Sequence, residues 1–151
     1  MNVFDILGPV MIGPSSSHTA GAARIGGVAR ALLGAPAVRA EILLHGSFAK
    51  TYRGHGTDKA LIAGIMGMAP DDARIRRAPE LARENGLRVS IAAGEIAGAH
   101  PNTARVTLTD AKGRSVTVVG SSVGGGSILV TEVNGMDVSF TGQHTTLIEL
   151  H

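Results

Sequence analysis

The spacing of hydrophobic residues in the first half of the chain is mostly helical. Apolar residues at i, i+3, i+4, i+7 and i+8 predict a helix over 18–33; they are Ile25, Val28, Ala29, Leu32 and Leu33. A second helix is predicted from Thr57, its N-cap candidate, to about Met68. Residues 70–86 are helical by pattern, and Pro79 is expected to split them, because proline suits the first turn of a helix better than its interior.

The second half of the chain alternates apolar and polar residues, which is typical of strands. Strands are expected over 87–93, 104–110, 114–120, 127–133 and 136–140, in addition to a buried strand over 38–46. DAKG at 110–113 and NG at 134–135 are expected to be hairpin turns. We therefore predict an α+β fold in one domain over residues 1–151, with helices packed on a mixed or antiparallel sheet.

Composition and charge narrow the class of protein. Hydrophobic residues make up 44% and charged residues 17%, so the chain is globular rather than disordered. The formal net charge is only +2 and no aromatic residues alternate with the arginines, which argues against a nucleic-acid partner. No apolar run approaches the roughly 18 residues of a membrane span. The N-terminus lacks the charged region of a signal peptide, so we expect no membrane association and a cytoplasmic protein.

The absence of cysteine excludes several kinds of chemistry. With no cysteine in the chain there is no disulfide, no thiolate nucleophile and no thiolate-held metal. The six histidines lack the spacings of zinc sites, so no metal ligands are predicted. GSSVG at 120–124 matches the letters of the GxSxG motif of α/β-hydrolases, but no helical pattern follows it as a nucleophile elbow requires, and a phosphate-binding P-loop is absent.

The segment GPSSSHT, residues 13–19, is the first candidate for chemistry. It gathers hydroxyl groups and a histidine before a predicted helix, namely Ser15, Ser16, Ser17, His18 and Thr19. One interpretation is an N-cap with solvated neighbours. The other is a site for a small carboxylate or phosphate, because a helix N-terminus offers free N–H groups and a positive dipole end. The residues alone do not distinguish the N-cap from the anion site.

Two further loops carry polar residues. His55 lies between Gly54 and Gly56, just before Thr57 and Asp58. It is either a general acid or base or an ordinary surface histidine beside a helix cap. AHPNTA at 99–104, which contains Asn102, is interpreted as a turn before a strand. The glycine-rich SSVGGGS at 121–127 indicates a bulge or tight crossover rather than a phosphate cradle, since no helical pattern follows it.

These motifs together resemble one enzyme family. GPSSSHT, then GHGTD, HPNTARVTL and SSVGGGSILVTEVNG, in this order, are similar to the β chain of bacterial iron–sulfur-dependent L-serine dehydratases of the two-chain type. The resemblance implies a lyase that converts L-serine to pyruvate and ammonia. It also implies a 4Fe–4S cluster held by a cysteine-bearing α chain, so this chain alone is expected to be inactive.

The resemblance also assigns roles to residues. His55 would be the catalytic base or a hydrogen-bonding group near the cluster. The serine loop, Ser15 to Thr19, would bind the substrate carboxylate beside the α partner. Thr57, Asp58 and Asn102 would be further substrate-side positions. In isolation, the chain either stays single or forms a homodimer through the surface meant for its partner.

An alternative function comes from the same resemblance. The β domain is similar to the allosteric substrate-binding domain of some phosphoglycerate dehydrogenases, which implies a similar fold. It also leaves open a non-catalytic module that binds a small anionic effector. Related β chains commonly continue into an ACT-type regulatory domain, whereas this sequence ends at HTTLIELH. ACT-mediated regulation is therefore not expected of it.

Overall fold

A computed structural model describes residues 16–50 and 56–141 of the chain, with side chains from Thr19 onwards. The helices are α2 (Ser16–Leu33), α4 (Thr57–Ile65), the 3-10 helix η2 (Ala73–Arg77) and α5 (Ala78–Glu84). The strands are β1 (Ala37–Gly46), β2 (Arg88–Gly94), β3 (Asn102–Asp110), β4 (Ser115–Gly124), β5 (Ser127–Val133) and β6 (Met136–Thr141). A short helical segment over 47–50 follows β1.

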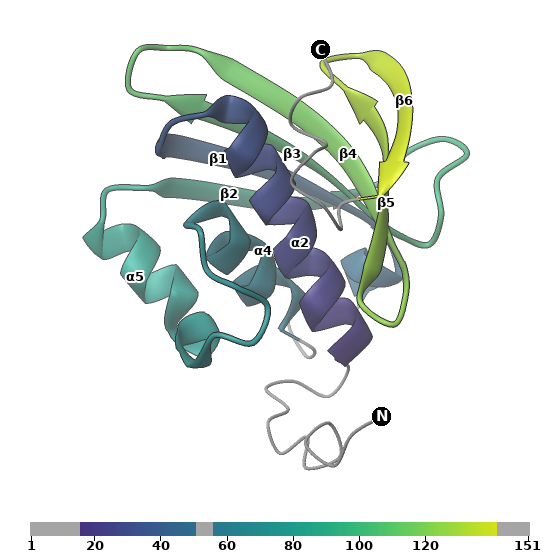
Figure 1. The fold of residues 1–151 in the computed structure, drawn as a ribbon, viewed down its shortest axis with the longest axis horizontal. Helices are drawn as coiled ribbons and strands as arrows, with labels where there is room; N and C mark the ends of the chain where they lie inside the picture. Colours follow the sequence, from purple (N-terminus) through teal and green to yellow (C-terminus); the bar gives the residue numbers. More distant parts are fainter. Residues whose placement is uncertain (1–15, 51–55, 142–151) are drawn as a thin grey trace.

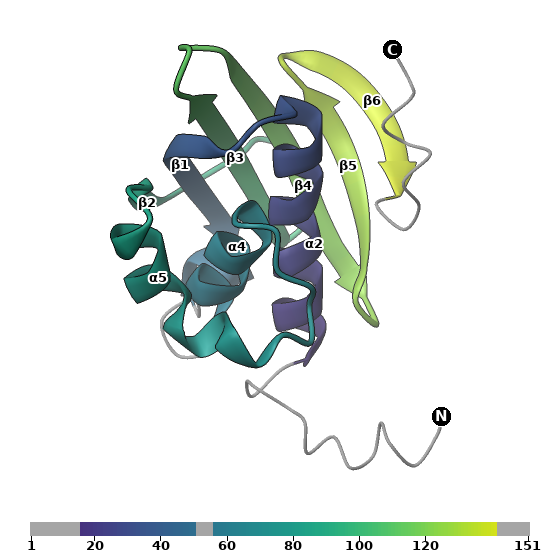
Figure 2. The same ribbon diagram turned by 60° about the vertical axis from the view of Figure 1, so that its left-hand side comes forward.

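The strands form one six-stranded mixed sheet in the order β2-β1-β3-β4-β5-β6. Strand β1 is parallel to β2 and antiparallel to β3, and the remaining neighbours are antiparallel. The helices lie together on one face of this sheet (Figure 1, Figure 2). The predicted α+β arrangement is therefore confirmed.

Two predicted helices differ from the observed ones at their ends. The helix predicted to reach Met68 ends at Ile65, where the N–H of Met68 donates to the Ala63 carbonyl and that of Gly67 to the Gly64 carbonyl. These bonds close the last turn and release the chain from helical geometry. The helix predicted over 70–86 is divided as expected, with Pro79 in the first turn of α5. Its first part is the 3-10 helix η2, capped by Asp72.

The core lies between the helices and the sheet and consists mainly of aliphatic side chains. Phe48 is its largest fully buried residue. Helices α2 and α4 cross with almost no side chain between them: a Cβ atom on Gly26 would come within 2.4 Å of the Leu61 carbonyl oxygen. Glycine at this crossing therefore lets the two backbones touch.

Both predicted hairpin turns are confirmed. Asp110 and Gly113 close the turn between β3 and β4, with a backbone bond from the Gly113 N–H to the Asp110 carbonyl. Asn134 and Gly135 both have positive φ and join β5 to β6, as the primed turns of hairpins require. Across the described ranges 16–50 and 56–141, no helix has the length and apolar character needed to span a membrane.

Candidate functional site

Two of the polar segments singled out in the sequence, AHPNTA and SSVGGGS, meet at one end of the sheet. Gly46 at the end of β1 pairs with Asn102 at the start of β3. Thr103 pairs in turn with Ser121 near the end of β4, and Gly124 pairs with Ser127 at the start of β5. One end of the sheet therefore carries the segment after β1, the HPNT loop (100–103) and the glycine turn (124–126). We call it the polar end.

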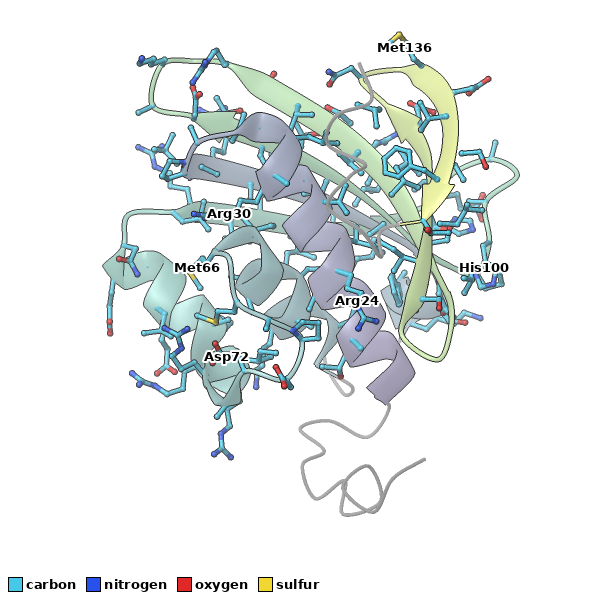
Figure 3. The ribbon with its side chains drawn as sticks, in the orientation of Figure 1. Arg24, Arg30, Met66, Asp72, His100 and Met136 are labelled. Carbon is cyan, nitrogen blue, oxygen red and sulfur yellow. The ribbon has the colours of Figure 1, made fainter. Side chains whose placement is uncertain are left out.

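Helix α2 also begins at the polar end. Gly21 faces Ser122, whose Oγ would lie 2.2 Å from a Cβ atom placed on Gly21. The half-buried Arg24 guanidinium donates to the Gly126 carbonyl oxygen. Figure 3 shows the Arg24 side chain on the outer side of α2, beside the turn between β4 and β5. The turn between β4 and β5 is thus fastened to the first half of α2, whose first residues, 16–19, are the last four of GPSSSHT.

Two buried threonine hydroxyls have no hydrogen-bond partner among the described residues. Thr19 in α2 is 6% exposed and Thr57 in α4 is 0% exposed, and neither Oγ1 is paired. A buried hydroxyl without a partner costs on the order of 1–3 kcal/mol. Each lies near the N-terminus of its helix, where backbone N–H groups also lack intrahelical partners. A ligand with acceptor atoms at these positions would remove the cost.

Thr57 is not the N-cap, contrary to the sequence-based prediction. The N-cap of α4 is Gly56, whose φ of 76° lies in the left-handed region, and it offers no side-chain cap. A threonine would be strained in that conformation, whereas glycine adopts it freely. The side chain of Thr57 is instead buried in the protein interior. The positive end of the α4 dipole therefore has no capping side chain.

The loop between β2 and β3 is tied to the end of β1. The N–H of Ile96 donates to Nδ1 of His45 at 2.9 Å, and the N–H of Ser47 donates to the Pro101 carbonyl at 2.7 Å. The contact is close enough that a Cβ atom on Gly46 would lie 2.3 Å from the Pro101 oxygen. The first residues after β1 are held by this loop before the chain reaches residues 51–55.

A short chain of hydroxyl hydrogen bonds supports the same loop. Thr103 Oγ1 donates to the His100 carbonyl at 2.6 Å and lies 2.7 Å from Ser121 Oγ. Since the Thr103 proton is used on the carbonyl, Ser121 is the donor in the second bond. The N–H of Asn102 donates to Nδ1 of His100 at 3.0 Å. The HPNT turn is therefore held by hydrogen bonds within the loop and by a hydrogen bond to Ser121 of β4.

The remaining predicted site residues are placed as follows. The half-buried Asp58 is in the first turn of α4 and lines a groove of about 400 Å³ that also involves α5 and β2. Ser16, Ser17 and His18 form the start of α2, and their side chains lie outside the described part. Ser15 and His55 lie outside the described residues altogether.

Among the described residues, two carboxyl groups have a clearly lowered pKa, and both belong to structural turns. Burial raises the pKa of Asp110, but hydrogen bonds from Arg114 and the Lys112 N–H outweigh it and hold that pKa below its usual value. The Arg74 guanidinium and N–H lower the pKa of Asp72 to about 2. Asp110 closes the β3–β4 turn and Asp72 caps η2, so neither lies at the polar end.

In the parts of the chain that the structure describes, no three His, Cys, Asp or Glu residues are grouped as metal ligands. A cleft of about 460 Å³ lies at the other end of α2, between Arg30, Gly34 and Met68. It shares no residue with the polar end.

Sequence reasoning missed several residues of the polar end. Arg24, Thr103, Ser121 and Ser122 were not predicted as site residues. Ser121 and Ser122 follow the apolar pair Val118 and Val119 and are both buried. Two adjacent serines directly after a predicted strand were visible in the sequence. The contact of Arg24 with Gly126 joins positions 102 residues apart, and no local pattern encodes it.

Comparisons with known proteins agree on one family. A family model described as "Serine dehydratase beta chain" matches residues 2–133. The chain is 47% identical over 150 residues to the probable L-serine dehydratase beta chain of Bacillus subtilis, covering 99% of this chain and 68% of that protein. It is 41% identical over 148 residues to the L-serine dehydratase beta chain of Peptoniphilus asaccharolyticus, covering 97% and 67%. L-serine dehydratase TdcG of Escherichia coli is 32% identical over 161 residues, covering 90% of this chain and 35% of that protein.

Proposed function

Because the chain belongs to the family of serine dehydratase beta chains, we propose that it supplies the substrate-binding half of an L-serine dehydratase active site. The other half would come from a cysteine-bearing α chain. The reaction removes the α-proton and the β-hydroxyl of L-serine as water. The resulting aminoacrylate is hydrolysed to pyruvate and ammonia.

The observation that carries this proposal is the pair of unpaired hydroxyls of Thr19 and Thr57. Both side chains are buried, Thr19 in the first residues of α2, which begins at the polar end, and Thr57 as the first residue of α4. A serine carboxylate is a small anion with several acceptor lone pairs, and helix N-termini favour such groups. We assign the carboxylate to this end, with Ser15, Ser16, Ser17 and His18 as further donors.

The chain's residues do not fit the cluster itself. A 4Fe–4S cluster is held by cysteine thiolates, and the sequence contains no cysteine. No group of His, Asp or Glu within the described ranges replaces them. The proposal therefore gives the cluster to the α chain and limits this chain to binding, orienting and proton transfer.

His55 is the proposed proton-transfer group. It follows the segment whose first residues are held by the HPNT loop, through the bond from the Ser47 N–H to the Pro101 carbonyl. Imidazole exchanges protons near neutral pH, which suits removal of a proton from carbon or its return to a leaving group. Asp58 and Asn102 are proposed as further substrate-side residues.

The test is reconstitution of the two chains under anaerobic conditions. The α chain is co-expressed with this chain, iron and sulfide content are measured, and pyruvate formation from L-serine is followed. We expect activity from the complex and none from this chain alone. A complex with a full cluster that binds L-serine without turnover would support a regulatory module instead and would refute the catalytic proposal.

A further inference from the structure

Strand β2 forms one margin of the sheet. Among the described strands it pairs only with β1, through seven consecutive residue pairs from Arg39–Arg88 to His45–Gly94, without a register shift. Figure 2 shows β2 at one side of the sheet and β6 at the other. The outward backbone groups of an edge strand are free to pair with another strand.

The two edge strands differ in how they discourage such pairing. The β5–β6 pair contains a register shift between Val130 and Glu132, and Asp137 is a charge within β6. Proteins use bulges and charges of this kind to block edge-to-edge association. Strand β2, RVSIAAG, has no proline and no charge after its first residue. Its edge is regular and unprotected by comparison.

An apolar groove lies beside this edge. It has a volume of about 400 Å³ and is lined by Ile62, Pro79, Ala82, Leu87, Val89 and Ile91, with Asp58 and Arg83 as its charged members. Val89 and Ile91 lie on the helix-covered face, because they pair in register with the core residues Ala40 and Ile42. A strand added to β2 would extend this apolar surface.

The charges along β2 fit a reversed copy of the same strand. Arg88 is the first residue of β2 and Glu95 directly follows its last residue; both are exposed. In an antiparallel copy, the end of β2 that carries Arg88 lies beside the end of the first strand that carries Glu95. The other two ends meet in the same way. A parallel neighbour would place like charges side by side.

We propose that β2 pairs antiparallel with β2 of a second copy of this chain, about Ile91. In this register Ile91 faces its own counterpart, Ser90 faces Ala92, and Arg88 faces Gly94 next to Glu95. The contact is self-complementary, as a two-fold interface requires. It joins the two sheets into one and brings the two apolar grooves together on the same face.

Charge reversal tests the orientation. The dimer dissociation constant of the full chain is measured by sedimentation for Arg88→Glu, for Glu95→Arg and for the double variant. Each single change should weaken dimerisation about two- to threefold, since strand ends of like charge are then brought together at both ends of the contact, and the double variant should recover most of the loss. Arg105→Glu is the control, because Arg105 is exposed on the inner strand β3.

Cysteine cross-linking tests the register. The chain has no native cysteine, so Ile91→Cys introduces a single thiol opposite its counterpart. Directly opposed residues of antiparallel strands lie about 4.5–5.5 Å apart at Cα, within reach of a disulfide. Oxidation should give a covalent dimer. Val138→Cys, a half-buried position on the other edge strand, is the control and should not cross-link.

Three results would overturn the proposal. The chain could be monomeric at every concentration tested. It could form a dimer that the charge variants do not weaken and that the thiol of Ile91→Cys does not cross-link. In the complex with the cluster-bearing chain, the same introduced thiol could cross-link to that chain instead, which would assign the edge to a different partner. None of these results bears on serine turnover, so they leave the proposed function untouched.

Discussion

Gly64 of α4 lies directly against the backbone of Ala23 of α2. A Cβ atom on Gly64 would come within 2.0 Å of the Ala23 carbonyl oxygen, and real Cβ contacts essentially never fall below 3.0 Å. The obstacle is backbone in the middle of a helix, which cannot rotate away as a side chain can. The distance between the two helices is therefore set at this point.

Gly64→Ala should destabilise the protein by about 2–3 kcal/mol, because overpacking at a rigid contact forces the helices apart. Gly27→Ala is the matched control, since nothing lies within 4 Å of a Cβ atom there. That change should instead raise the free energy of unfolding, by up to about 1 kcal/mol, through helix propensity. Urea denaturation measures both. Equal effects at the two positions would show that the crossing is not tightly packed.

Thr57→Val should leave the free energy of unfolding unchanged or raise it by about 1 kcal/mol, because it removes a buried hydroxyl that lacks a partner while keeping the shape. In the reconstituted enzyme it should raise KM for L-serine. Thr107→Val is the control, because it breaks the 3.0 Å bond between the Thr107 and Thr117 hydroxyls, away from the polar end. Loss of stability with unchanged KM in Thr57→Val would mean that the hydroxyl has a structural partner.

His55→Ala should lower kcat of the reconstituted enzyme by about 10²- to 10⁴-fold, the usual contribution of a general acid or base. Iron and sulfide content, α-chain binding and the melting temperature should stay normal, since the role assigned to His55 is proton transfer. The measurement is pyruvate formation at saturating L-serine. An unchanged kcat would remove His55 from the reaction.

Asp110→Asn should make stability less sensitive to acid. Burial raises the pKa of Asp110 in the folded state, but hydrogen bonds from Arg114 and the Lys112 N–H outweigh burial, so the folded-state pKa is lowered. The carboxylate therefore stabilises the fold above its unfolded pKa of about 3.9, and this contribution is lost as the pH falls through the lowered value. Melting temperatures between about pH 5 and pH 2 should fall less steeply in the variant. Parallel curves would contradict the assignment.

The elements were predictable because periodicity is a local property. The helix over 18–33 and the five strands of the second half follow from spacing alone, and the structure confirms them. Helix ends were less certain, because Met66 and Met68 continue the apolar pattern beyond the last helical residue. The chain leaves the helix at Gly67, where φ is +91°, and hydrophobicity carries no information on that angle.

The arrangement of the polar end was not predictable from the sequence. It depends on β1 lying beside β3, and that pairing is set by long-range packing rather than by residues near either strand. The cap of α4 was wrongly assigned to Thr57 because threonine is a good N-cap on average. The N-cap is instead the preceding residue, Gly56, because glycine readily adopts the positive φ found at this position.

The place of β1 between β2 and β3 has a consequence for synthesis. Gly46 finds its neighbour Asn102 only after α4, α5 and β2 have all been made, and closing so long a loop carries an entropic cost that slows folding. A chain that has left the ribosome only as far as β2 has one side of β1 still open. The loops of the polar end are then dispersed, and they assemble only when β3 and β4 arrive.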